Sequence, residues 1–134
     1  MKINKIDHIG VVVKDIEKAK VFYRDVLGLK QGAEDEYMDN YHCVIAFFPC
    51  GEVEVELIAP TSPESSYADY IEQYGEGIHH IAFLVEDIGE ALGEMKQKQV
   101  QLVDYIPKRG AAKATIAFLH RDAAFGSSIE LTQR

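Results

Sequence analysis

Two histidines and two glutamates recur at matching places in two similar halves of the 134-residue sequence. The stretch around His8 aligns without a gap with the stretch around His80, and a second pair of similar stretches contains Glu56 and Glu130. Imidazole nitrogens and carboxylate oxygens are ligands for divalent metals of borderline hardness. A single histidine or glutamate on a strand is usually an ordinary structural or surface residue, but the joint duplication favours a metal site. If a pseudo-twofold axis relates the halves, the four side chains converge near it.

The elements that carry these residues also repeat. Residues 5–19 align with residues 77–91, and residues 46–57 resemble residues 117–131. In each copy a β-branched run ends at an Asp-Ile pair whose aspartate, Asp15 or Asp87, is suited to cap a helix. Apolar residues at helical spacing follow, and Gly28 marks the end of the first helix. Three short strands are expected after each helix, at residues 29–36, 42–49 and 52–58 and at residues 101–105, 114–120 and 127–132.

Each copy therefore reads β-α-β-β-β, which predicts an α+β fold made of two repeated modules. We expect module 1 at residues 1–60, a linker helix within residues 61–76 and module 2 at residues 77–134. Neither half alone is expected to cover both faces of a four-stranded sheet, so we expect a single domain, residues 1–134, with one curved structure.

Side-chain parity separates the proposed ligands from the core. Successive side chains of a strand point to opposite faces. In the first strand Val11 is expected to face the helix and His8 the opposite side. The same alternation places Val55 and Leu57 in the core with Glu56 opposite, Val85 in the core with His80 opposite, and Leu131 in the core with Glu130 opposite.

Composition excludes several classes of partner. Lys and Arg number 14 against 22 Asp and Glu, a net charge of −8, so binding to nucleic acid or to anionic lipid is disfavoured. The apolar runs are shorter than a membrane helix requires, and the first residues lack the apolar core of a signal peptide. We expect a soluble protein of the cytoplasm without nucleic-acid or membrane partners.

The two cysteines do not predict chemistry. Cys43 and Cys50 lack the spacing of a metal or redox motif and lie in or beside an apolar stretch. We expect both to be reduced and packed as small hydrophobic residues.

Several segments resemble the vicinal oxygen chelate superfamily, to which glyoxalase I belongs. They are Asp7-His8-Ile9-Gly10, Asp15-Ile16, residues 22–29 and residues 56–60. Within that superfamily, residues 60–66, 75–82 and 117–120 resemble the methylmalonyl-CoA epimerase branch. The resemblance covers nearly the whole chain.

The resemblance implies paired modules that form a cupped mixed sheet around one divalent ion, which is cobalt, nickel, zinc, manganese or magnesium. The implied ligands are His8, Glu56, His80 and Glu130, the residues that the repeat also selects. In an epimerase the ion would stabilise the enolate of methylmalonyl-CoA, and Glu130 would serve as one of the two acid/base groups. The resemblance also implies a homodimer.

Two positions depart from the epimerase pattern. Tyr41 occupies the place where the family often has a catalytic glutamate, and we expect it to contact substrate instead. The family's Gly-Ala-His-Gly loop reads Gly110-Ala111-Ala112-Lys113 here. Lys113, together with Lys108 and Arg109, is suited to attract an anionic thioester.

Two other functions stay open at this point. A glyoxalase I-type lyase acting on a methylglyoxal–glutathione hemithioacetal uses the same metal and proton-transfer chemistry, although no glutathione site is evident. A non-catalytic protein that binds a small molecule in the same cup is the second alternative, and it would not need four metal ligands.

Overall fold

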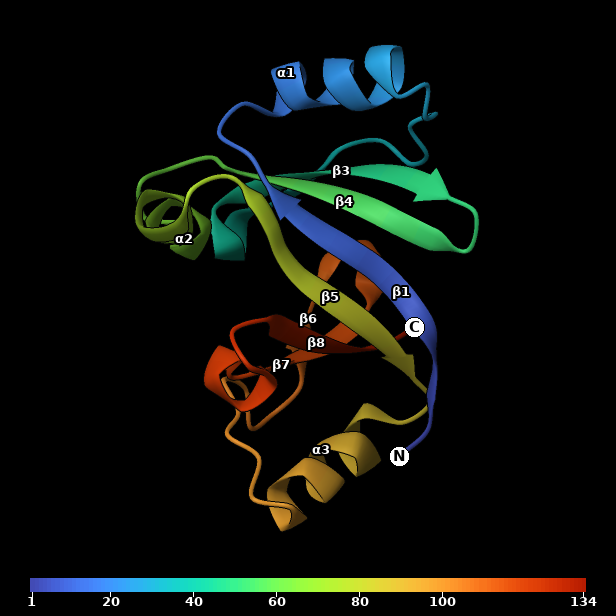
Figure 1. Cartoon of the computed structure of the whole chain (residues 1–134), viewed down its shortest axis with the longest axis vertical. Coiled ribbons are helices and arrows are strands. Elements are labelled where there is room, and N and C mark those ends of the chain that lie inside the picture. Colours follow the sequence, from blue (N-terminus) through green and yellow to red (C-terminus); the bar gives the residue numbers. More distant parts are fainter. The chain divides into compact units, whose positions relative to one another are not determined.

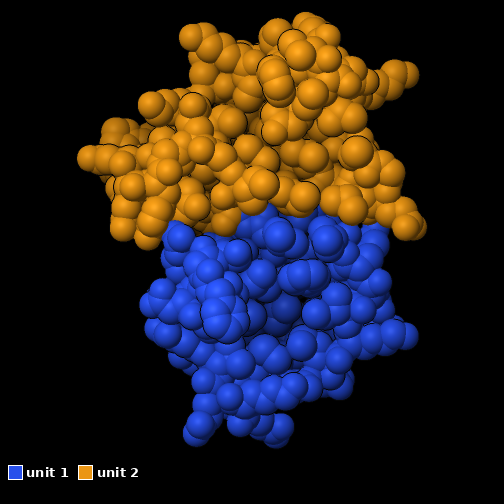
Figure 2. Space-filling view, in the orientation of Figure 1, with its two compact units in different colours: residues 1–8, 80–134 blue, residues 9–79 orange.

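Alternating apolar residues build an eight-stranded sheet in the computed structural model, which describes the whole chain from Met1 to Arg134. The chain forms two units, shown in different colours in Figure 2. Unit 1 comprises residues 1–8 and 80–134, and unit 2 comprises residues 9–79. Strands β1 (Ile3–Val12) and β5 (Gly77–Val85) cross the boundary, so each contributes to both units.

Unit 2 contains the elements of the first copy and the linker helix. These are α1 (Ile16–Val21), the π-helical turn η1 (Phe22–Val26), β2 (Glu36–Met38), the 3₁₀ turn η2 (Asp39–Tyr41), β3 (Cys43–Cys50), β4 (Val53–Pro60) and α2 (Ser66–Tyr74). The strand order is β2-β3-β4-β1, and β3 pairs antiparallel with both β2 and β4. The buried Ala46, Phe48 and Leu57 pack against Val11 and Val55, which confirms the core parity expected for β1 and β4.

The first helix differs from its prediction. The spacing of apolar residues predicts one helix with Ile16, Ala19, Phe22, Tyr23, Val26 and Leu27 on its buried face. Instead α1 ends at Val21, and the Leu27 amide donates to the Phe22 carbonyl at 3.0 Å, an i→i+5 bond. The wider π turn rotates the following side chains relative to an α-helix. Tyr23 therefore packs on the core, whereas Phe22, Val26 and Leu27 are about half exposed or more.

Unit 1 contains the remaining elements of the second copy. These are α3 (Ile88–Gln97), β6 (Lys108–Arg109), the 3₁₀ turn η3 (Ala111–Lys113), β7 (Thr115–Leu119), the 3₁₀ turn η4 (Arg121–Ala124) and β8 (Ser128–Gln133). The strand order is β1-β5-β8-β7-β6; β5 and β8 are parallel, while β7 pairs antiparallel with β8 and β6. Figure 1 shows α3 beside the strands of this unit.

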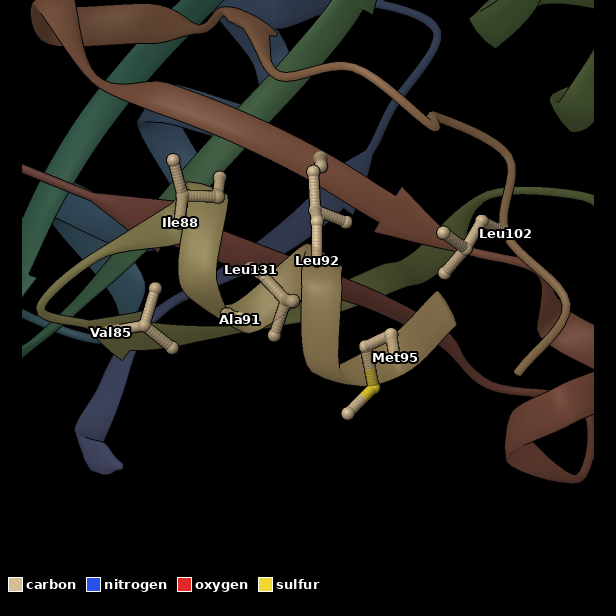
Figure 3. Packing of buried hydrophobic residues seen from close by; sticks show 8 residues of the cluster. Val85, Ile88, Ala91, Leu92, Met95, Leu102 and Leu131 are labelled. Atoms are coloured by element: carbon tan, nitrogen blue, oxygen red, sulfur yellow. The ribbon is translucent and has the colours of Figure 1, made fainter. Parts of the chain in front are cut away.

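The core of unit 1 forms between α3 and its strands. Asp87 caps α3 by accepting a hydrogen bond from the Glu90 amide at 2.9 Å, as the sequence predicts. The helix then buries one face, and the cluster in Figure 3 comprises Val85, Ile88, Ala91, Leu92, Met95, Leu102, Ala117 and Leu131. The presence of Val85 and Leu131 confirms the core parity expected for β5 and β8.

Two predicted strands are wrong in position. The strand expected at residues 29–36 is replaced by β2, which begins only at Glu36. Before it, the Gly32 amide donates one hydrogen bond to the Phe47 carbonyl of β3. The strand expected at residues 101–105 is reduced to an isolated bridge between Leu102 and Leu119, and β6 forms later in the chain. Both segments contain too few alternating apolar residues to hold a full ladder.

The order of elements confirms the predicted fold class. Strand β1, helix α1 and β2-β3-β4 give one β-α-β-β-β succession, and β5, α3 and β6-β7-β8 give the other. Helix α2 lies between them, inside the predicted linker region. None of the helices has the length and apolar character that a membrane span requires. The module boundaries themselves stay a prediction.

Candidate metal centre

Three of the four predicted ligands meet in unit 1. His8 from β1, His80 from β5 and Glu130 from β8 are all buried, each with 3% of its surface exposed. One donor atom from each residue lies within 4.8 Å of the others. The strand order β1-β5-β8 brings the three strands side by side. On each strand the core residues project to one face, so His8, His80 and Glu130, which alternate with them, project to the other.

The donor atoms of this cluster are close enough to share one centre. Nε2 of His8 lies 3.1 Å from Nε2 of His80. The Glu130 carboxylate reaches both rings, with Oε1 3.4 Å from His8 Nε2 and Oε2 3.4 Å from His80 Nε2. The rings meet edge to face, with centroids 5.1 Å apart.

His8 is oriented by a carboxylate on its far side. Asp7 Oδ2 lies 2.7 Å from His8 Nδ1, and the guanidinium of Arg134 donates to both oxygens of Asp7. Burial acts to raise the pKa of Asp7, but the hydrogen bonds with His8 and Arg134 outweigh it and hold the pKa well below its usual range. An ionised carboxylate only accepts, so Nδ1 of His8 carries the proton and donates it. When the ring is neutral, Nε2 presents a lone pair to the cluster.

Glu130 is held by its neighbour on the same strand face. The Thr132 hydroxyl donates to Glu130 Oε1 at 2.5 Å, and Thr132 is fully buried. Burial raises the pKa of the Glu130 carboxyl, against the opposing effects of His8 and of the Thr132 hydrogen bond. The Glu130 carboxyl group and the ring nitrogens of both histidines thus converge in a buried place, where an ionised carboxylate needs a proton or a cation beside it.

The cluster fits a divalent ion. Nitrogen and oxygen ligands about 2.1 Å from one centre lie roughly 3.0 to 3.4 Å from one another at right or tetrahedral angles. The histidine nitrogens are 3.1 Å apart, and each lies 3.4 Å from a different oxygen of Glu130, which agrees with that spacing for a carboxylate that uses both oxygens. The second hydrogen bond of His8, to Asp7, is the partner that metal-bound histidines ordinarily have. The donor set of two nitrogens and one carboxylate suits the borderline ions expected from the sequence.

The other predicted residues belong to other elements of the fold. Glu56 is buried on β4 in unit 2, with 4% exposure, and its place among the ligands stays a prediction. Tyr41 ends the η2 turn of unit 2, where its carbonyl accepts a hydrogen bond from Ser65 Oγ at 3.0 Å. Lys113 is exposed on the η3 turn of unit 1 with a left-handed φ of 62°. Substrate contact by Tyr41 or Lys113 also stays a prediction.

Of the two cysteines, only Cys43 is buried as the sequence predicts. Cys43 is free and buried, and burial raises the pKa of its thiol to about 12, which removes the thiolate near neutral pH. Cys50 is exposed at the end of β3, so its expected burial is wrong.

Sequence reasoning missed the residues that support the ligands. Thr132 shares the strand face of Glu130, and this parity is visible in the sequence. Asp7 could have been noticed as an acidic neighbour of a proposed ligand. Arg134 carried no signal, because its contact with Asp7 spans nearly the whole chain.

Comparisons with known proteins agree with this geometry. Residues 7–118 match the family model of the glyoxalase/bleomycin resistance protein/dioxygenase superfamily. The chain belongs to this superfamily. An uncharacterised protein of Bacillus subtilis, YqjC, is 38% identical over 97% of this chain and 92% of its own length. An ethylmalonyl-CoA/methylmalonyl-CoA epimerase of Cereibacter sphaeroides is 33% identical over 98% of each chain.

A solved structure of this superfamily extends the likeness to the fold. A methylmalonyl-CoA epimerase in complex with methylmalonyl-CoA and NH4+ superposes with a TM-score of 0.91, at 27% identity, and covers 98% of this chain and 95% of its own. The resemblance seen in the sequence is therefore confirmed: this glyoxalase-superfamily chain has methylmalonyl-CoA epimerases among its relatives and its structural neighbours.

Proposed function

We propose that this chain is a divalent-metal-dependent epimerase that moves the α-proton of methylmalonyl-CoA, or of a closely related 2-alkylmalonyl thioester. The buried cluster of His8, His80 and Glu130 carries the proposal, because it offers a metal-ligand set in a chain that aligns over nearly its whole length with an epimerase. The two histidines and Glu130, with Glu56 as a fourth ligand, would hold the ion. A bound divalent ion would act as a Lewis acid toward the thioester carbonyl and the carboxylate of the substrate.

The side chains of the cluster have separate tasks. The Asp7–His8 hydrogen bond keeps the Nε2 lone pair of His8 directed at the centre. Glu130 is the proposed acid/base on one face of the substrate: the α-carbon–hydrogen bond breaks and the proton passes to a carboxylate oxygen. Thr132 donates to Oε1, so Oε2, which lies nearer His80, is the oxygen without that hydroxyl donor. A second group returns a proton from the opposite face and inverts the centre.

The experiment is α-proton exchange of methylmalonyl-CoA in heavy water, with cobalt-loaded protein, chelator-treated protein and buffer alone side by side. We expect rapid exchange with inversion only in the cobalt-loaded sample. Glu130→Gln should lower the exchange rate by roughly 100-fold or more, since it removes the proposed base. Glu90→Gln, at an exposed position of α3, is the matched control and should leave the rate unchanged.

The same samples separate the alternatives. Isomerisation of methylglyoxal with glutathione, without exchange of methylmalonyl-CoA, would replace the proposal with a glyoxalase-type lyase. Ligand binding without turnover of either substrate would favour the non-catalytic alternative. A homodimer is proposed on the resemblance alone, and a cytoplasmic location on the shortness of the apolar runs; sedimentation equilibrium and cell fractionation test them.

A further inference from the structure

A lysine lies on the same sheet face as the candidate metal centre. In register, Lys108 of β6 faces Ile116 of β7, and Ile116 faces Thr132 of β8. Paired residues of neighbouring strands project to the same side, and so do residues two apart on one strand. Because Thr132 shares its face with Glu130, the side chain of Lys108 projects from the face that carries the proposed ligands.

Side-chain contacts lead from this lysine to the centre. Nζ of Lys108 lies 5.4 Å from the centroid of the Phe118 ring, and the Phe118 ring meets the His80 ring edge to face at 5.2 Å. Phe118 is also the register partner of Glu130. The ammonium therefore lies within about 11 Å of the His80 ring, since the two centroid distances laid end to end set the upper limit.

An ion pair with Asp104 also holds the ammonium of Lys108 in place. Asp104 Oδ1 lies 3.1 Å from Lys108 Nζ, while Asp104 Oδ2 accepts a hydrogen bond from the Phe118 amide at 2.9 Å. One carboxylate thus ties the lysine to β7. The lysine side chain is 35% exposed, so it is accessible to a solute.

We propose that Lys108 binds the carboxylate of an acyl thioester that occupies the centre formed by His8, His80 and Glu130; this inference rests on the proposed function. The centre contains the carboxylate of Glu130 and the chain has a net charge of −8, so a cation beside the centre would add to the proposed divalent ion in offsetting the charge of an anionic substrate. Contact with the Phe118 ring helps to hold the ammonium, which is also paired with Asp104.

The distance favours the acyl carboxylate over a phosphate of coenzyme A. The pantetheine arm separates the thioester from the nearest phosphate by roughly 15 Å or more when extended. The carboxylate of a malonyl-type group is only a few bonds from the carbonyl. A cation within about 11 Å of His80 is therefore better placed for the carboxylate.

The two other cations of this segment are less suited. Arg109 follows Lys108 on β6 and projects to the opposite face by strand alternation. Lys113 lies beyond the strand on the exposed η3 turn. Of the three cations that the sequence groups together, Lys108 is the one that register and contacts connect to the centre.

The test compares two lysines that each pair with an acidic residue four positions earlier in the chain. Lys108 pairs with Asp104, and Lys98, the C-cap residue of α3, pairs with Glu94 at 3.1 Å. Lys108→Met should raise the KM for methylmalonyl-CoA by roughly 10- to 100-fold, the effect of losing a charge-assisted hydrogen bond, with a much smaller change in kcat. Lys108→Arg should restore most of the loss. Lys98→Met should behave like the parent protein, and circular dichroism checks folding.

Two further arms identify the bound group and keep this test independent of turnover. With methylmalonyl-pantetheine, which lacks phosphates, the Lys108→Met effect should persist; its disappearance would assign Lys108 to a phosphate and overturn the proposal. Calorimetry of methylmalonyl-CoA with chelator-treated protein should show weaker binding to Lys108→Met than to Lys98→Met. If the parent protein fails to exchange the α-proton, the proposed function is wrong. Equal binding of methylmalonyl-CoA to Lys108→Met and Lys98→Met would separately refute the role of Lys108.

Discussion

His8 and His80 hold equivalent places in the two copies of the repeat, yet different neighbours surround them. His8 is preceded by Asp7, whose carboxylate contacts Nδ1 and is itself held by Arg134. His80 is preceded by His79, whose ring lies against Tyr67 and Tyr70 in unit 2. The ring of His80 meets the edge of Phe118 instead. The repeat therefore reproduces the donor atom in each copy, while the contacts around that atom differ.

The helices of the two copies differ in the same way. Both begin at an aspartate that caps the first turn, Asp15 or Asp87. Helix α3 has ten residues and buries four of them, whereas α1 has six residues, none of them fully buried. Duplicated sequence thus specifies where a helix starts, but the packing of its face depends on residues outside the duplicated stretch.

The largest effect is expected from removing either donor. His80→Ala and His8→Ala should each lower bound metal, measured by elemental analysis, by more than about 100-fold in affinity, and turnover should fall with it. If the repeat supplies equivalent donors, the two losses will be of similar size.

The control for this pair is His120→Ala, which changes a histidine that caps the η4 turn. It should keep its metal. Full metal content in folded His80→Ala would remove that residue from the centre, and a loss confined to His8→Ala would show that the two copies are not functionally equivalent.

The shared face of His8, His80 and Glu130 could be predicted from the sequence because period-two alternation is a local property. Parity alone places His8, His80 and Glu130 opposite the core residues beside them, and the strand order then brings them together. Arg134 could not be predicted in this way, since its contact with Asp7 is made through tertiary structure. The π turn after α1 could not be predicted for a related reason. Its residues fit α-helical spacing, and their exposure follows from the wider turn, which the spacing does not indicate.

The second prediction concerns the two helices and uses the same truncation in each. Leu92→Ala on α3 should lower the free energy of unfolding by about 2–5 kcal/mol, because Leu92 is 2% exposed in the core of unit 1. Leu27→Ala, after the π turn, should cost less than about 1 kcal/mol, because Leu27 is 53% exposed. Urea denaturation measures both values. Equal costs would mean that the first helix packs as its sequence spacing predicts.

The third prediction separates the supports of the two histidines. Asp7→Asn should weaken metal binding by roughly 10- to 100-fold, because an amide no longer provides the charged acceptor that fixes the proton on His8 Nδ1. Phe118→Leu, which changes the ring beside His80 and keeps an apolar side chain, should change metal affinity by less than about threefold. Metal titration followed by cobalt absorption measures both.

A matched control for Asp7→Asn is Asp25→Asn, since Asp25 also pairs with an arginine, Arg24 at 2.9 Å, but on the exposed surface. It should leave metal affinity unchanged. Equal affinity of Asp7→Asn and the parent protein would show that His8 is positioned by packing alone, and the contrast between the two histidines would lose its electrostatic basis.

The smallest effect is expected at the two caps, which are the most similar features of the copies. Asp15 accepts from the Lys18 amide at 3.1 Å and Asp87 from the Glu90 amide at 2.9 Å. Loss of such a cap costs about 1 kcal/mol when the helix it starts is coupled to the core. Asp87→Ala should approach that value, because α3 buries four side chains, whereas Asp15→Ala should cost less, because α1 has no fully buried side chain and can fray while the core stays packed. Amide hydrogen exchange locates the difference: faster exchange confined to α1 in Asp15→Ala supports local fraying, whereas faster exchange throughout unit 2 would show that α1 is coupled to its core as firmly as α3 is to its own.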